Sequence, residues 1–185
     1  VTVRSMKMHG GGFSTGGGKR PRPEEVAKEN VEAVRAGANT NMARHIRNMS
    51  RFGVPVIASV NVFPTDTEAE IEVLLDEARE AGAADAVVTR VHSDGGEGGA
   101  DLARAVVTAC QSHIAEGRPF EPLFGPNAPL EEKILRIATN VYGAASIDLA
   151  PKALNELKTL QNWGYGNLAV CMAKTQYSFS HEMKE

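Results

Sequence analysis

The sequence predicts an α/β fold in which a parallel sheet is flanked by helices. Two continuous apolar runs rich in β-branched residues, 54–60 (VPVIASV) and 85–91 (DAVVTRV), are typical of parallel strands that are covered on both faces. Each run is followed by a loop and then by a helical pattern, over 65–80 and 100–112. A strand, a loop and a helix that repeat in this order indicate a parallel sheet. Thr65 or Asp66 is expected to cap the first of these helices.

The N-terminal region is rich in glycine, proline and basic residues. Residues 1–8 could form a short strand, and the segment that follows up to residue 23 is expected to form a loop without regular structure. From residue 24 to residue 51, apolar side chains recur at helical spacing. This predicts one long helix or two short ones, with Gly37 as a break and Gly53 as the stop.

A helical segment follows the α/β part. After a loop over 117–129, helical patterns cover 130–142 and 151–163, and the second begins with proline at a first-turn position. Residues 167–173 (NLAVCMA) are a third strand candidate. We therefore expect three parts: a Gly/Pro-rich loop region at 1–23, an α/β portion at 24–116, and at 117–185 a helical segment with a further strand that could belong to a second domain.

The composition excludes several classes of protein. The chain has 185 residues, of which 42% are hydrophobic, so one compact domain with a core can form. Its 20 basic and 23 acidic residues give a net charge of -3, and no basic stripe is interleaved with aromatic residues, so we expect no nucleic-acid partner. No apolar run is long enough to span a bilayer, so we expect no membrane partner.

Metal sites, disulfides and hydrolase triads are not indicated. The two cysteines form no CxxC pair, and the five histidines lack the spacing of metal ligands. No nucleophile elbow is present either. The cysteine usage fits a reducing compartment, and the N-terminus does not have the pattern of a signal peptide. Because the chain begins with Val1 instead of methionine, we expect it to be a fragment of a longer protein.

Ligands of open parallel sheets bind at the carboxyl ends of the strands, so the loops there are the candidate site. The loop after the first strand carries Asn61, Phe63, Pro64 and Asp66. A flat heterocycle could stack on Phe63 while Asn61 or Asp66 binds its polar edge. The alternative is that Asp66 caps the helix and Phe63 seals the core.

The loop after the second strand, from His92 to Gly99, contains four glycines. Their backbone amides could approach a ligand closely near the start of a helix. It is not a Walker sequence, because no Lys-Ser or Lys-Thr follows the glycines. The alternative is a turn that only needs positive φ, with His92 as a solvated side chain. In a third segment, Lys174 could bind an anion or could simply be solvated.

Long colinear stretches of the sequence resemble one enzyme family. They are KMHGGG at 7–12, FGVPVIASVNVFPTDTEAEIE at 52–72, GGEGG at 95–99, EEKILRIATNVYGA at 131–144 and GYGNLAVCMAKTQYSFSH at 164–181. They resemble formate–tetrahydrofolate ligase, an ATP-dependent enzyme with a P-loop NTPase-like fold. The resemblance implies that ATP phosphorylates formate to formyl phosphate, and that the N10 amine of tetrahydrofolate attacks it to give 10-formyltetrahydrofolate.

The same resemblance implies roles for individual residues. Phe63 and Pro64 match family positions that line the folate or adenine end of the active cleft, and His92 falls where the family commonly has a stacking tryptophan. Gly95 and Gly96, in the glycine run beside it, are likewise expected to bind the folate or adenine. The catalytic residues and phosphate loop of the family lie upstream of this segment. No catalytic residue is therefore assigned, and the isolated chain is expected to be inactive.

The resemblance also implies ligands and context. ATP with Mg²⁺ and tetrahydrofolate would be the co-substrates, with a monovalent cation as a further ligand. The full-length enzyme would be a cytoplasmic homo-oligomer. Two alternatives stay open at this point: a non-catalytic remnant or binding module of the same fold, or another ATP-dependent ligase of the P-loop class.

Overall fold

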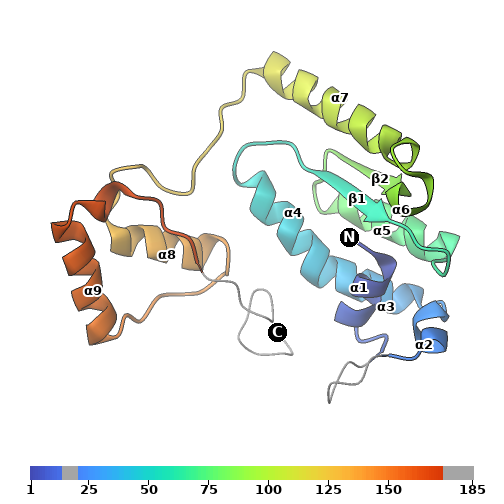
Figure 1. The fold of residues 1–185 in the computed structure, drawn as a ribbon, viewed down its shortest axis with the longest axis horizontal. Helices are drawn as coiled ribbons and strands as arrows, with labels where there is room; N and C mark the ends of the chain where they lie inside the picture. Colours follow the sequence, from blue (N-terminus) through green and yellow to red (C-terminus); the bar gives the residue numbers. More distant parts are fainter. Residues whose placement is uncertain (14–20, 173–185) are drawn as a thin grey trace. The chain divides into compact units, whose positions relative to one another are not determined.

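The computed structural model describes residues 1–13 and 21–172 of the chain and divides it into two compact units. The first unit covers residues 1–120 and holds both strands (Figure 1). The second unit covers residues 121–185, and its described part is helical. The chain is therefore α/β with a small parallel sheet, while the division into three parts stays a prediction.

The two strands of the first unit pair in parallel, as the sequence predicts. Strand β1 spans Ile57–Asn61 and β2 spans Asp85–Thr89, and Ile57 lies opposite Asp85 while Asn61 lies opposite Thr89. Val1 lies along β1, where its amino group donates to the Ser59 carbonyl at 2.7 Å. Because the strands run in the same direction, both of their carboxyl ends meet at one edge of the sheet.

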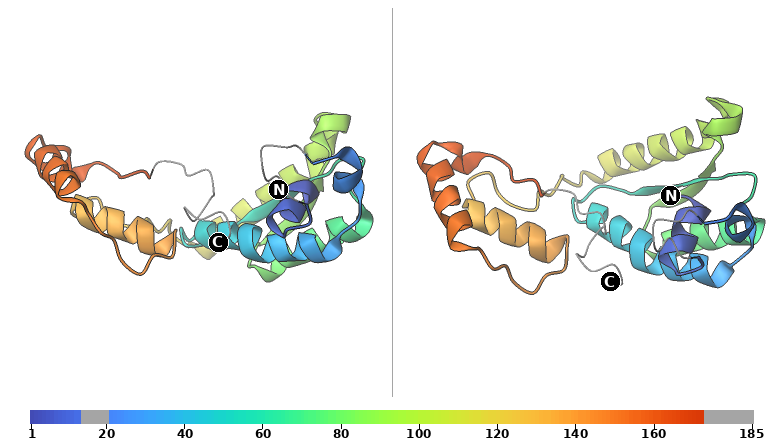
Figure 2. Two further views of the ribbon diagram at one scale, coloured as in Figure 1. Left: turned by 90° about the horizontal axis from the view of Figure 1, so that it is seen from below. Right: turned by 60° about the horizontal axis from the view of Figure 1, so that its bottom comes forward.

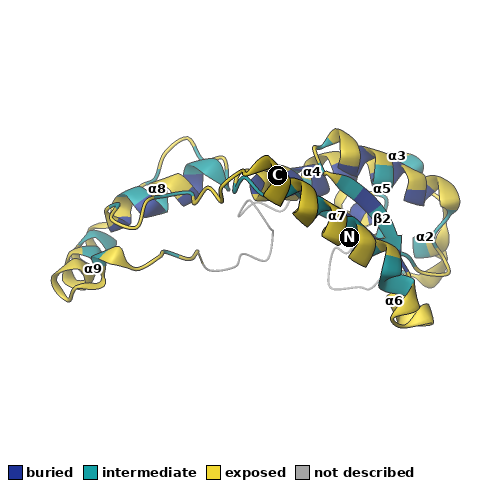
Figure 3. Ribbon diagram, turned by 90° about the horizontal axis from the view of Figure 1, so that it is seen from above, coloured by how far each residue is buried: buried dark blue, intermediate teal, exposed yellow. Residues whose placement is uncertain are grey.

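Each face of the sheet is covered by one helix. Helix α5 (Glu68–Glu80) packs Ile71 and Leu74 onto Val60 and Ala86, in the main hydrophobic core. Successive side chains of a strand point to opposite faces of the sheet. Ile57 is on the face opposite to α5, and this face lies toward α7 (Ala100–Glu116). No residue of α7 is buried, and Figure 3 draws most of it as exposed. A cavity of about 620 Å³ lies between α7 and this face.

The N-terminal residues form a helix, so the prediction of a strand over 1–8 was wrong. Helix α1 spans Val3–His9, and Thr2 and Ser5 form a capping box at its start. Val3, Met6 and Lys7 are buried, and this spacing of three and four residues places them on one helical face. The capping box and the helical spacing of the buried residues favour a helix more strongly than the β propensity of Val1 and Val3 favours a strand.

The region expected to form one or two helices forms three helices and a π-helical turn. They are α2 (Pro23–Ala27), α3 (Val31–Gly37), the turn Ala38–Met42 and α4 (Ala43–Ser50). Gly37 is not a break, because α3 continues directly into the π-helical turn. Gly53 lies just beyond α4 with φ of 72°, which suits the stop that the sequence predicts.

Helices α1 and α3 approach each other closely through two glycines (Figure 2). A Cβ atom added at Gly37 would lie 1.9 Å from the carbonyl oxygen of Met6, and one added at Gly10 would lie 1.8 Å from that of Ala33. No side chain fits at either position without separating the two helices.

Gly37→Ala is therefore expected to destabilise the first unit by about 1–3 kcal/mol, the usual cost of overpacking a tight contact. Urea denaturation of the chain followed by circular dichroism measures this change. Gly96→Ala is the matched control, because Gly96 has φ of -60° and no atom within 4 Å of an added Cβ. Equal midpoints for both variants would show that the helices can separate freely.

The second unit contains two longer helices, as the sequence predicts. They are α8 (Leu130–Asn140) and α9 (Pro151–Asn162), with Pro151 in the first turn. The strand expected over 167–173 is absent from the described residues: a 3₁₀ turn covers Tyr165–Asn167, and residues 168–172 have no regular structure. The carbonyls of Gly166, just before this run, and of Leu168 accept hydrogen bonds from Lys133.

Candidate functional site

A cavity of about 270 Å³ lies where the loops after β1 and β2 meet. Parallel pairing brings these loops to one edge of the sheet, which is where such folds bind ligands. Four residues that the sequence predicts for the site, Phe63, Pro64, Asp66 and His92, line this cavity. The remaining lining residues are Val62, Glu68, Ile71, Arg90 and Ser93.

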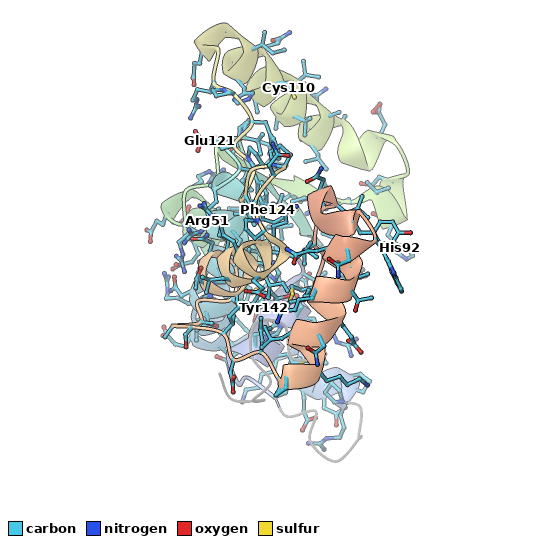
Figure 4. All side chains as sticks on the ribbon, turned by 90° about the vertical axis from the view of Figure 1, so that its left-hand side faces the viewer. Arg51, His92, Cys110, Glu121, Phe124 and Tyr142 are labelled. Carbon is cyan, nitrogen blue, oxygen red and sulfur yellow. The ribbon has the colours of Figure 1, made fainter. Side chains whose placement is uncertain are left out.

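Phe63 and His92 supply two flat side chains to the cavity. Their ring centroids are 6.4 Å apart and the rings are tilted by 39°. Phe63 is 39% exposed, and His92 lies on the short helix α6 (Val91–Asp94), from which its ring projects away from the ribbon (Figure 4). Phe63 therefore does not seal the core, and its ring is available to a ligand.

Asp66 closes the loop that carries Phe63. Its Oδ2 accepts the Phe63 backbone N–H at 2.9 Å, and its own N–H donates to the Phe63 carbonyl at 3.0 Å. Neither Asp66 nor Thr65 caps α5, because Thr67 does so through a capping box with Glu70. Partial burial raises the pKa of Asp66, and the Phe63 N–H partly offsets this rise.

The glycine run shapes the turn between α6 and α7. Gly95 ends α6 with φ of 58°, a conformation that favours glycine, whereas Gly96 lies in open space. Gly98 makes the close approach, since an added Cβ would lie 2.4 Å from the Arg90 carbonyl oxygen. Neither Gly95 nor Gly96 lines the cavity, and the positive φ of Gly95 serves the turn.

Two other predicted residues are not brought to the cavity. Asn61 ends β1, where its backbone N–H donates to the Val1 carbonyl, and it is not among the lining residues. Lys174 lies outside the described residues.

Sequence reasoning missed Arg90 as a site residue. The predicted strand ran to residue 91, which would have made Arg90 a strand residue, but β2 ends at Thr89. Arg90 is therefore the first residue after a strand, where site residues gather, and its side chain is exposed beside the aromatic pair.

The larger cavity under α7 is a weaker candidate. The inner side of α7 presents small and polar residues to it, such as Ala105, Thr108 and Ser112. Among the described residues, the ring of His113 is the one flat ring that lines that cavity, and its Nδ1 atom is buried without a hydrogen-bond partner. A flat heterocycle would find no stacking partner opposite it, so we favour the smaller cavity.

The described part of the chain has neither a metal-binding cluster nor a membrane-spanning helix. Residues 1–13 and 21–172 contain no cluster of three or more His, Cys, Asp or Glu side chains that could hold a metal ion. Within the same residues, no helix has both the length and the apolar character needed to cross a membrane.

Relatives of this chain share most of its length. It is 44% identical over 184 residues to formate–tetrahydrofolate ligase of Roseiflexus castenholzii, covering 100% of this chain and 32% of that protein. The ligase of Paracoccus denitrificans is 45% identical over 180 residues, covering 97% of this chain and 30% of the relative. The cytoplasmic C-1-tetrahydrofolate synthase of Schizosaccharomyces pombe is 43% identical over 182 residues, covering 98% and 19%.

The chain thus spans less than a third of the length of these relatives. The family model described as formate–tetrahydrofolate ligase matches residues 1–185, which is the whole chain. Colinear identity across both units agrees with this match. The chain belongs to the formate–tetrahydrofolate ligase family.

Proposed function

We propose that this chain forms part of the folate-binding wall of an ATP-dependent ligase that joins formate to tetrahydrofolate. The observation that carries the proposal is the pair of rings, Phe63 and His92, on one cavity at the carboxyl edge of the sheet. Membership of the ligase family supplies a substrate with a flat ring, the pyrimidine ring of the reduced pterin, for these side chains. The product is 10-formyltetrahydrofolate.

Recognition of the pterin combines stacking with polar contacts. Its flat ring packs against Phe63 and His92, since aromatic faces favour offset stacking. The amino and amide edge of the pterin offers donors and one carbonyl acceptor. Asp66 can accept from those donors, and Arg90 can donate to the carbonyl, because both line the same cavity. Asn61 and Lys174 are assigned no contact in this arrangement.

The complete reaction uses parts of the ligase beyond this chain. ATP, bound with Mg²⁺, phosphorylates formate, and the N10 amine of tetrahydrofolate then attacks formyl phosphate and releases phosphate. We assign these steps, the phosphate-binding loop and the wider P-loop NTPase-like fold to the full-length ligase. A monovalent cation site, a homo-oligomeric state and a cytoplasmic location are part of the same proposal.

Replacing His92 by tryptophan in the full-length ligase is expected to tighten tetrahydrofolate binding. Indole offers a larger apolar face than imidazole, and an aromatic pair contributes about 0.5–1.5 kcal/mol beyond area burial, or roughly two- to tenfold in affinity. Isothermal titration with tetrahydrofolate measures the change.

His113→Trp is the control, because His113 lies on α7 and lines the other cavity. Its affinity for tetrahydrofolate is expected to equal that of the unchanged ligase. If His92→Trp also binds with unchanged affinity, His92 does not contact the pterin.

A further inference from the structure

A buried ion pair lies close to the loop at 63–66, which carries Phe63 and is called the folate-facing loop below. The Lys7 Nζ atom of α1 is 2.7 Å from the Glu70 Oε1 atom of α5, and the two side chains are 2% and 0% exposed. Neither residue lines the candidate folate cavity, so neither touches a ligand there.

The pair has a nearly complete set of partners. Lys7 also donates to the backbone carbonyls of Val26 at 3.0 Å and Lys28 at 2.8 Å. Glu70 accepts the backbone N–H of Asn30, the N-cap of α3, at 2.7 Å. The three protons of the ammonium group therefore meet three oxygen atoms, and the two charges neutralise each other.

Stability alone does not account for such a pair. Desolvation of two charges offsets most of their attraction, so a buried ion pair is often no more stabilising than apolar residues of similar size. What this pair does provide is a defined geometry, because it joins α1, the segment after α2, the start of α3 and the start of α5 at one point.

The start of α5 is continuous with the folate-facing loop. Glu70 completes the capping box with Thr67, and Asp66 immediately precedes Thr67. Asp66 in turn holds Phe63 through two hydrogen bonds. A shift of Glu70 therefore moves the turn that aims the Phe63 ring into the cavity.

The pair also acts on Asp66 through its charges. Glu70 raises the pKa of Asp66 and Lys7 lowers it, both more weakly than burial does. Glu68, Arg90 and His92 share the cavity with Asp66 and face it from α5 and from the second loop. The charges of Lys7 and Glu70 are therefore close enough to Asp66 to affect a residue of the candidate site.

We propose that Lys7 and Glu70 are positioning residues that hold the Phe63–Asp66 turn in the geometry that binds tetrahydrofolate. The proposal rests on the function proposed above. The pair is proposed to affect the affinity of the ligase for tetrahydrofolate but not its affinity for ATP.

The test is a double variant, Lys7→Met and Glu70→Met, in the full-length ligase. It removes both charges together, so no unpaired charge stays buried, although the Val26 and Lys28 carbonyls and the Asn30 N–H lose their partner. We expect the KM for tetrahydrofolate to rise about tenfold, which corresponds to about 1.4 kcal/mol, while the KM for ATP stays within about twofold. Glu70→Gln keeps an acceptor oxygen for the Asn30 N–H but leaves the buried Lys7 charge without its counter-charge, so it is expected to raise the same KM at least as much.

The matched control is the double variant Asp101→Met and Arg104→Met. This pair has the same 2.7 Å separation in the same unit, but its side chains are 76% and 71% exposed. Both KM values are expected to stay unchanged. The inference is overturned if the Lys7 and Glu70 variants keep the normal KM for tetrahydrofolate, or if the KM values for both substrates rise together.

Phe63→Ala separates the two proposals: if it leaves the KM for tetrahydrofolate unchanged, the proposed folate site itself is wrong.

Discussion

Replacing Lys133 by methionine is expected to lower the free energy of unfolding of the second unit by about 3 kcal/mol. Lys133 is fully buried, and its Nζ atom donates to the carbonyls of Pro126, Gly166 and Leu168 at 2.9–3.0 Å. Methionine fills a similar volume but donates nothing. The three carbonyl oxygens would then lose a partner, at about 1–3 kcal/mol each where water does not replace the lysine, and the removal of a buried charge offsets part of that cost.

Urea denaturation of the chain measures this change. Lys152→Met is the control in the same unit, because Lys152 is 88% exposed and its contact with Glu156 is 3.9 Å long. A surface pair of this kind contributes about 0–1 kcal/mol. If the two variants unfold at the same urea concentration, the three carbonyls do not depend on Lys133.

Replacing Phe63 by alanine in the full-length ligase is expected to weaken tetrahydrofolate binding strongly. Stacking of a flat heterocycle on an aromatic side chain contributes about 1–3 kcal/mol by alanine substitution, which is roughly 5- to 150-fold in the dissociation constant. Because Phe63 is 39% exposed and outside the main core, its loss should affect the ligand more than the fold. Isothermal titration with tetrahydrofolate gives the dissociation constant.

Phe120→Ala is the matched control for Phe63→Ala. Phe120 is also exposed and also pairs with a second ring, since it stacks on Phe52 with centroids 5.6 Å apart. It lies in the same unit but not on the candidate cavity. Tetrahydrofolate affinity is expected to be unchanged in this variant. Similar losses in both variants would mean that Phe63 acts through the fold.

The parallel sheet could be predicted because its signals are local and mutually consistent. Continuous apolar runs marked β1 and β2, and helical periodicity marked α5 and α7 between and after them. Topology then predicted that Phe63 and His92 would share one edge of the sheet, and both line the same cavity. Neither step needed a contact between distant residues.

The errors arose where short-range signals compete. Two valines favoured a strand over 1–8, but the capping box of Thr2 and Ser5 and the buried face of Val3 and Met6 favour the helix that forms. The apolar run at 167–173 also suggested a strand, yet a run of this kind needs a pairing partner. Among its described residues, the Leu168 carbonyl accepts a hydrogen bond from the Lys133 side chain, and no strand forms.

Long-range pairs of charged residues could not be predicted at all. Nothing near Lys7 in the sequence points to Glu70, and a lysine among apolar residues is usually a solvated side chain. Arg90 was missed for a different reason, because the strand boundary lies two residues earlier than the apolar run suggests. The residue at which a strand ends determines which side chains reach the site. Periodicity predicts that a strand exists better than it predicts where the strand ends.

The most direct test of the folate site is a crystal structure of the full-length ligase with tetrahydrofolate bound. We expect the pterin to lie in the cavity lined by Phe63, Asp66, Arg90 and His92. Its ring centroid should be about 4.5–7 Å from that of Phe63, the range of stacked aromatic pairs. A pterin bound elsewhere in the ligase, with this cavity unoccupied, would contradict the proposed role of the two loops.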